Sequence, residues 1–172
     1  MGLEIDKHIS DDFRTLYIKQ KAKRGIIQPF LKTQNGAREV DLCTELAELL
    51  RKYVADRREG LLFHTSTGAQ LLQANTLQDS LHPILKNLKH PKGGFNIFRR
   101  FRLTYVSKSE CPEFLRHFWS GQAQRHVSDR YIKMLQERAF RLEWAEKGRH
   151  GIQGPSWPTW PTFANEKIGV SC

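Results

Sequence analysis

Three features of the sequence carry side chains suited to chemistry at a phosphate ester. Tyr131 could act as a nucleophile at phosphorus and form a phosphotyrosine intermediate. Lys32 stands before an expected hairpin turn, where it could swing over a bound phosphodiester and protonate the leaving oxygen. Arg99, in the stretch FNIFRRFRLT, could be held by packed aromatic side chains and offer its guanidinium to phosphate oxygens. Arg100 and Arg102 better suit contacts to a DNA backbone, or ion pairs.

Each feature also has a plain structural interpretation. A lysine on a hairpin is usually an exposed charge, and three arginines on one helix are often a solvated face. A tyrosine with apolar neighbours is usually a core residue. No single residue distinguishes the two interpretations, but the order and spacing of the residues do.

Composition bounds the class of protein. The 172 residues carry a net charge of +10, which favours an anionic partner, with nucleic acid first and an anionic membrane second. Cys43, Cys111 and Cys172 are widely spaced and form no CxxC pair, so we expect reduced thiols in a cytoplasmic protein rather than disulfides or a zinc site. We expect no metal, because the histidines lack ligand spacing, and no membrane span or signal peptide.

The first quarter of the chain predicts a small antiparallel sheet of three strands. Residues 15–21 alternate apolar and polar side chains, and runs 26–32 and 38–42 flank Asn35-Gly36. Asn-Gly between two such runs favours a hairpin, because both residues tolerate positive φ.

The remainder changes to a helical period, so the predicted fold is α+β: the sheet followed by a mostly helical body. Residues 1–149 form one predicted domain, and 150–172, with the motif SWPTWPT, form a C-terminal tail. Thr44 is a plausible helix cap, 61–63 a short edge strand, and Pro83 a kink or late helix start. The expected helices span 44–57, 75–88, 95–108, 112–119 (stopping at Gly121) and a long stretch from 128 to about 148 that presents Ile132, Leu135, Ala139 and Leu142 on one face.

The order of these features resembles the catalytic domain of tyrosine recombinases, the phage-integrase family. The matching stretches are FLKTQNGAREVDL, FNIFRRFRLT and HFWSGQAQRHVSDRY, and LEIDKHISDDFRTLYIKQ resembles the lead into the family's first catalytic-domain strands. A Lys-Thr pair precedes a hairpin turn, an arginine lies on a later helix, and Tyr131 follows the Gly121-Gln122 step. Arg99 and Tyr131 are 32 positions apart, as in the family. The resemblance covers roughly residues 3 to 145.

The resemblance implies a reaction. In the family, a tyrosine attacks the scissile phosphate and leaves a 3′-phosphotyrosyl link, and a 5′-hydroxyl of the partner strand then rejoins the DNA. By the resemblance Tyr131 is the nucleophile, Lys32 the general acid, and Arg99 the second of two arginines that hold the non-bridging oxygens. No cofactor is implied, since the phosphotyrosine keeps the bond energy. The expected DNA-binding residues are Arg100, Arg102, Arg125 and Arg130, and the partner is double-stranded DNA.

Three departures from the family pattern stand out. The family's other arginine lies on a helix just ahead of the segment where this chain begins, and neither Arg14 nor Arg24 stands in that context. Asn96 and Gln122 occupy positions where histidine is common. Asn and Gln can donate hydrogen bonds to phosphate, but neither titrates near neutral pH. We therefore expect electrostatic support to survive in part while proton transfer at these positions does not.

These departures leave open what the chain does. The leading expectation is a DNA integration and recombination domain with impaired activity, and the alternative is an inactive DNA-binding remnant of a mobile-element integrase. An unrelated basic α+β protein with a structural Tyr131 is a third. The tail could mediate self-association on DNA, or it could be a disordered end.

Overall fold

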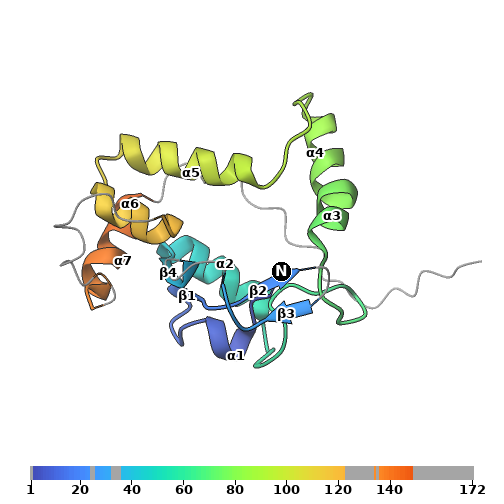
Figure 1. The fold of residues 1–172 in the computed structure, drawn as a ribbon, viewed down its shortest axis with the longest axis horizontal. Coiled ribbons are helices and arrows are strands. Elements are labelled where there is room, and N and C mark those ends of the chain that lie inside the picture. The colour runs from blue at the N-terminus through green and yellow to red at the C-terminus, as the bar shows by residue number, and fades with distance from the viewer. Residues whose placement is uncertain (1, 24–25, 32–35, 123–133, 135, 149–172) are drawn as a thin grey trace, which may run out of the picture.

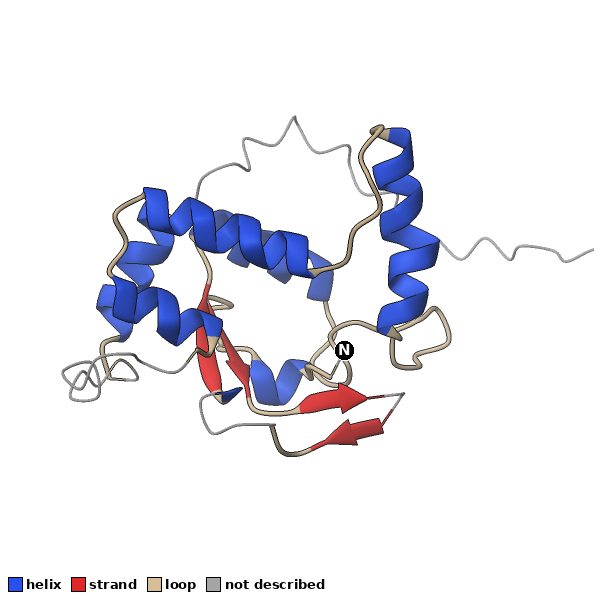
Figure 2. Cartoon of the chain, turned by 45° about the horizontal axis from the view of Figure 1, so that its top comes forward, coloured by secondary structure: helices blue, strands red, loops and turns tan. Residues whose placement is uncertain are grey.

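The structure is a computed structural model that describes residues 2–23, 26–31, 36–122, 134 and 136–148. Short strands near the N-terminus are followed by helices, so the fold is α+β as predicted. In Figure 1, helix α5 crosses the top of the body, α1 and the strands lie below it, and α3 and α4 stand as an arm to one side. Figure 2 shows the same division between strands and helices.

The strands form two separate two-stranded sheets rather than the single three-stranded sheet predicted. Strand β1 (Thr15–Ile18) pairs antiparallel with β4 (Arg38–Asp41), and β2 (Lys21–Lys23) pairs antiparallel with β3 (Ile26–Gln28). The expected pairing of 26–32 with 38–42 is therefore wrong. Pro29 follows β3 directly, and because proline has no N–H to donate, it ends the run that the sequence pattern extends to residue 32. Asn35 lies outside the described residues.

Helix α1 (Ile5–His8) and helix α2 (Thr44–Val54) enclose a first apolar core. Its buried members are Ile5, Val54 and Leu62. The expected strand at 61–63 is present only as a single bridge between Leu61 and Glu4. Thr44 is the first residue of α2 and not its cap, which is Cys43.

The arm contains α3 (Gln73–Thr76), a π-helical segment η2 (Leu77–Leu81) and α4 (His82–Asn87). Pro83 lies in the first turn of α4, but the helical run begins at Gln73 and continues through η2 into α4, so a late helix start at Pro83 is wrong. Proline lacks the N–H that an α-helix needs at this position, so a local change in the helix beside it is expected. The N–H of His82 bonds to the carbonyl of Leu77, five residues back, which makes the junction π-helical. No residue of these three segments is buried.

Helices α5 (Asn96–Lys108), α6 (Glu113–Ser120) and α7 (Arg138–Lys147) enclose the second core. α6 ends at Gly121, whose φ of 65° is the left-handed conformation that glycine adopts without cost. The buried members of this core are Val106, Cys111, Leu115 and Met134, with Phe114, Phe118, Trp119, Phe140 and Trp144 packed against them.

The long helix predicted from residue 128 is wrong at residues 134–137, where Met134 and Gln136 lie in turns and α7 begins only at Arg138. Its predicted face is also wrong, because Ala139 is exposed and the inward positions are Arg141 and Ala145. Arg141 faces inward because it forms ion pairs with the carboxylates of Glu39 and Asp41 on β4. Ile132 and Leu135 lie outside the described residues.

Candidate phosphate-binding site

The predicted site residues divide between the described and the undescribed parts of the chain. Asn96, Arg99, Arg100 and Arg102 lie on α5, and Gln122 follows the end of α6. These five can be placed. Lys32, Arg125, Arg130 and Tyr131 lie outside the described residues.

Arg99 joins α5 to the C-terminal end of α6. Its Nη2 donates a hydrogen bond of 2.5 Å to the carbonyl oxygen of Ser120, the last residue of α6. Gln122 lies two positions further on, is exposed, and donates its backbone N–H to the carbonyl of His117 at 3.1 Å. The structure thus brings Arg99 to the segment that carries Gln122, although the two residues are 23 positions apart.

The other predicted residues of α5 have different surroundings. Asn96 is exposed at the first turn, three positions before Arg99 and so on the same side of the helix. Arg100 is exposed. Arg102 donates to the carbonyl oxygen of Gly148 at the end of α7, and burial lowers its pKa. This contact joins α5 to α7, so the guanidinium of Arg102 has a role within the fold.

Aromatic packing around Arg99 is less tight than the sequence suggested. The rings of Phe95 and Phe98 lie 6.4 Å apart, but Phe98 is 54% exposed and Phe101 is 60% exposed. The hydrogen bond to Ser120 is therefore the polar contact that fixes the guanidinium, in place of the expected aromatic cage.

Arg38 is a residue that the sequence reasoning missed. It is half-buried on β4, where its Nε donates to the carbonyl of Trp119 and its Nη1 to the carbonyl of Gly36, both at 2.9 Å. Burial lowers its pKa, and the neighbouring charge of Arg99 lowers it further. Two guanidinium groups therefore meet at consecutive carbonyls of α6. The available sequence signal was an arginine directly after the expected hairpin turn.

The carbonyls at a helix C-terminus carry partial negative charge, which attracts cations. This attraction explains in part why two arginines can share the end of α6. Carbonyl oxygens are neutral groups, however, so they offset the repulsion between the two cations only partly.

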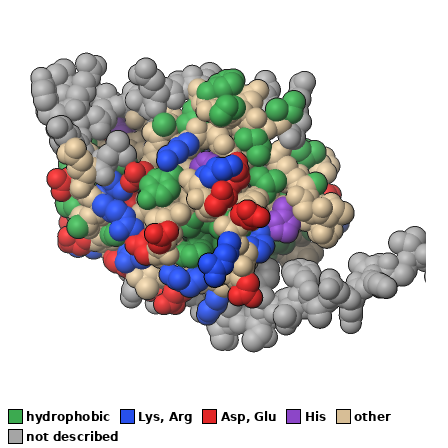
Figure 3. Space-filling view, turned by 90° about the horizontal axis from the view of Figure 1, so that it is seen from below, with side chains coloured by type: hydrophobic (Ala, Val, Ile, Leu, Met, Phe, Trp, Pro, Cys, Tyr) green, Lys and Arg blue, Asp and Glu red, His purple; other side chains and the backbone are tan. Residues whose placement is uncertain are grey.

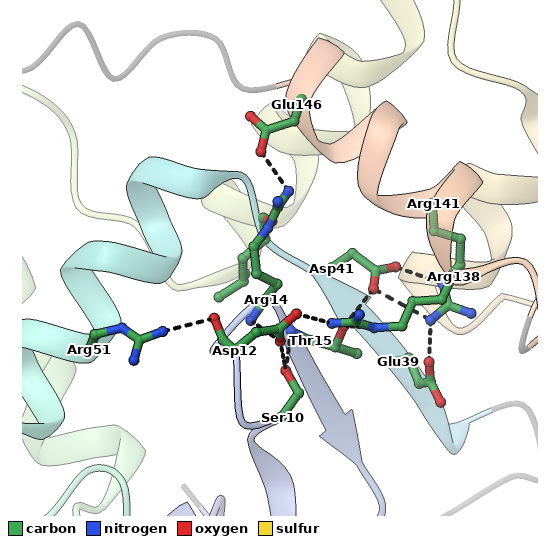
Figure 4. A network of polar contacts seen from close by, with 11 residues as sticks. Ser10, Asp12, Arg14, Thr15, Glu39, Asp41, Arg51, Arg138, Arg141 and Glu146 are labelled. Atoms are coloured by element: carbon green, nitrogen blue, oxygen red, sulfur yellow. Dashed lines mark hydrogen bonds and ion pairs between the residues drawn. The ribbon is translucent and has the colours of Figure 1, made fainter.

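A buried polar network holds this end of α6 against β4. Figure 4 shows the part of it that joins Asp41 and Glu39 of β4 to Arg141 of α7. Asp41 accepts hydrogen bonds of 2.8 Å from the indole Nε1 of Trp119 and from Nε of Arg141, and one of 3.0 Å from the hydroxyl of Thr15. Arg141 is fully buried and also contacts Glu39. Because Asp41 binds the side chain of Trp119, it fixes the position of the carbonyl that Arg38 uses.

Arg14 lies at the edge of this network and bonds to groups other than Arg38 and Arg99. Its Nη2 donates to the carboxylate of Glu146 at 2.5 Å and its Nε to the carbonyl of Leu42 at 3.2 Å. The same carboxylate accepts hydrogen bonds from the N–H and the hydroxyl of Thr44. Glu146 of α7 therefore caps the first turn of α2, where backbone N–H groups have no partner within the helix. Arg14 therefore acts within the fold, where it joins the start of β1 to α7.

His117 supplies no imidazole at the surface of this site. It is 8% exposed and its Nε2 lies 3.5 Å from the carboxylate of Glu113. Within the described residues its Nδ1 has no hydrogen-bond partner.

The face seen from below, on the side of α1, carries lysine and arginine side chains interspersed with aspartate and glutamate (Figure 3). Mixed signs at short range do not produce the single-sign field that attracts a polyanion. Asp12 with Arg138 and Glu4 with Lys7 are two of the ion pairs in the described residues. This face is therefore a poorer DNA-binding candidate than the arginine pair at α6.

In the part of the chain that the structure describes, no three His, Cys, Asp or Glu side chains gather as a metal-binding group. Among the described helices, none has the length and apolar character needed to cross a membrane. Comparison with protein-family models, curated proteins and solved structures finds no match to the chain.

Proposed function

We propose that the chain cleaves and rejoins DNA strands through a 3′-phosphotyrosine at Tyr131, as a tyrosine-recombinase-type domain of reduced activity. The observation that supports this best is the hydrogen bond from Arg99 to the end of α6. It joins two of the stretches on which the resemblance rests, the arginine helix and the segment leading to Tyr131. A phosphate held there would lie beside Gln122.

The proposed reaction assigns one task to each residue. Tyr131 gives its phenolic proton to solvent and its oxygen attacks phosphorus, the bond to the 5′-oxygen breaks, and Lys32 gives that oxygen a proton. Arg99 donates to a non-bridging oxygen, where charge grows in the transition state. Rejoining reverses these steps with a 5′-hydroxyl as the nucleophile, so the reaction needs no cofactor.

Reduced activity follows from the groups at Asn96 and Gln122. Each amide can hydrogen-bond to phosphate, but neither can take or give a proton near neutral pH. Loss of one donor at a comparable electrostatic site costs about 10²–10³ in rate. We therefore expect single slow turnovers rather than efficient recombination.

The experiment is a covalent-trapping assay with nicked duplexes of randomised sequence, from which the short downstream fragment with the new 5′-hydroxyl diffuses away after cleavage. A denaturation-resistant protein–DNA adduct is expected at low salt, absent in Y131F and much reduced in R99Q. R58Q is the matched control, because Arg58 is exposed on the loop after α2. No adduct at high protein concentration and low salt would refute the proposal.

The second candidate is a DNA-binding module without cleavage. It is favoured by the exposed amide of Gln122 at a position where the family commonly has histidine, together with the burial of the nearby imidazole of His117. This function predicts duplex binding that weakens steeply with salt and is the same in Y131F as in the wild type. Unmeasurable affinity at low salt would exclude it.

A further inference from the structure

Arg38 and Arg99 reach the same end of α6 from two different elements. Arg38 bonds to the carbonyl of Trp119 from β4, and Arg99 bonds to the carbonyl of Ser120 from α5. The charge of Arg99 acts on Arg38 strongly enough to lower its pKa, after the larger effect of burial. The two guanidinium groups are therefore neighbours.

Within the described residues, no carboxylate pairs with either of these arginines. The partners found for them are the neutral carbonyls of Gly36, Trp119 and Ser120. Three other arginines have acidic partners: Arg14 has Glu146, Arg138 has Asp12, and Arg141 has Asp41 and Glu39. Arg57 and Arg102 also bond to backbone carbonyls, but among the residues described each does so without a second guanidinium at the next carbonyl. A pair of like charges left without an acid is an arrangement that favours an anion.

The hydrogen bonds to carbonyls use only some of the guanidinium donors. Each arginine has five N–H groups. In the described part of the chain, Arg38 uses Nε and Nη1, and Arg99 uses Nη2. Both retain donors, and the carbonyl contacts hold the planar groups in place, which lowers the entropy lost when an anion binds.

We propose that Arg38 and Arg99 form a two-guanidinium clamp for a single phosphodiester, so that Arg38 supplies from β4 the second arginine that the sequence motifs lack. The DNA ligand of this clamp rests on the proposed function. The recognition of one tetrahedral phosphate group by two guanidinium groups does not depend on cleavage.

The clamp also joins two elements through Arg38. Arg38 lies on β4 and bonds to the carbonyl of Gly36 and to the carbonyl of Trp119 in α6. A phosphate bound by Arg38 would therefore be fixed relative to β4 and α6 together. Arg38 is a substrate-binding residue in this scheme.

The test is a double-mutant cycle on duplex binding with R38Q, R99Q and the double variant, measured by fluorescence anisotropy over a salt series. Two arginines on one phosphate should be coupled: each single change weakens binding about tenfold or more, and the double change weakens it by less than the product. The slope of log affinity against log salt should fall by about one for the double variant, because one phosphate contact is lost.

Two results would overturn the clamp. Binding by R38Q equal to that of the control R58Q would show that Arg38 does not touch DNA. Multiplicative losses with a slope reduced by about two would show that the arginines bind separate phosphates.

A second variant and a second ligand keep the test independent of folding and of cleavage. R38K keeps the charge but not the fork, so it should lose most of the affinity that R38Q loses while unfolding at a higher temperature. Inorganic phosphate should raise the melting temperature of the wild type but not of R38Q or R99Q. Stabilisation by phosphate without any Tyr131 adduct would refute the proposed function and leave the clamp standing, and equal stabilisation of all variants would refute the clamp.

Discussion

Replacing Asp41 by asparagine should destabilise the fold more than any exposed charge change. Oδ2 of Asp41 accepts from Nε1 of Trp119 and Nε of Arg141, and Oδ1 accepts from Thr15. In D41N one oxygen becomes an NH₂ group, which cannot accept. If the NH₂ group faces Trp119 and Arg141, two donors meet a donor; if it faces Thr15, the hydroxyl can accept, but Nη2 of Arg141, 3.5 Å from that atom, faces a donor. In either orientation Arg141 keeps only Glu39 as a carboxylate partner.

The magnitude follows from burial. The side chains of Asp41 and Arg141 are both 0% exposed in this ion pair. Removing one partner of a buried pair costs about 3–5 kcal/mol, because the other charge stays buried without compensation. For a chain of this size, that loss corresponds to a melting temperature lower by about 6–20 °C.

The assay is urea unfolding at pH 7, followed by circular dichroism, with D12N as the control. Asp12 also binds an arginine, at 2.6 Å, but the two side chains are 47% and 40% exposed. An exposed pair contributes about 0.2–1 kcal/mol. If D41N and D12N lowered the free energy of unfolding equally, the buried network would not be what holds α6 and α7 to β4.

Three further predictions concern single positions. Burial raises the pKa of the Asp12 carboxyl, but hydrogen bonds from Arg138, Ser10 and the N–H of Arg14 outweigh burial and hold that pKa below its usual value. The small difference in unfolding free energy between wild type and D12N should therefore be constant near neutral pH and shrink as the pH falls below about 4. Urea melts over a pH series measure this difference. Burial raises the pKa of the Cys111 thiol to about 11. In a C43S/C172S background, the rate of Cys111 alkylation should therefore be low at pH 8, rise about tenfold per pH unit up to that pKa, and become high in urea. Fast alkylation of the folded protein at pH 8 would contradict this. G121A should lower the free energy of unfolding by about 1–2 kcal/mol, since φ is 65° at Gly121, whereas an alanine change at exposed Ser107 should have little effect.

The local signals in the sequence predicted several helices well. The extent of α5 and the end of α6 at Gly121 depend on residues within one or two turns, so the pattern contains them. Strands β1, β3 and β4 lie within the predicted runs, but β2 was not predicted as a separate strand, 61–63 forms no strand, and the predicted pairing was wrong. Asn35-Gly36 outweighed Pro29 in the prediction, and the pairing of β1 with β4 depends on contacts between residues 20 to 26 positions apart.

The inward face of α7 and the contacts of Arg38 could not be predicted, for a different reason. A periodicity argument treats arginine as a surface residue, yet Arg141 faces inward because Asp41 and Glu39 lie opposite it on β4. Arg38 was not predicted because its partners are the backbone carbonyls of Trp119 and Gly36. Every residue has a carbonyl, so the sequence does not indicate which one an arginine will bind. Both errors concern tertiary contacts between elements far apart in the chain.

The central claim is that Tyr131 forms a covalent bond to DNA, and peptide mass spectrometry tests it most directly. The adduct trapped on nicked duplexes would be digested with nuclease and protease, and fragment spectra of the peptide containing Tyr131 would be recorded. The account predicts a nucleotide 3′-phosphate on the phenolic oxygen of Tyr131. A nucleotide on another side chain, or an unmodified Tyr131 in every peptide, would contradict it.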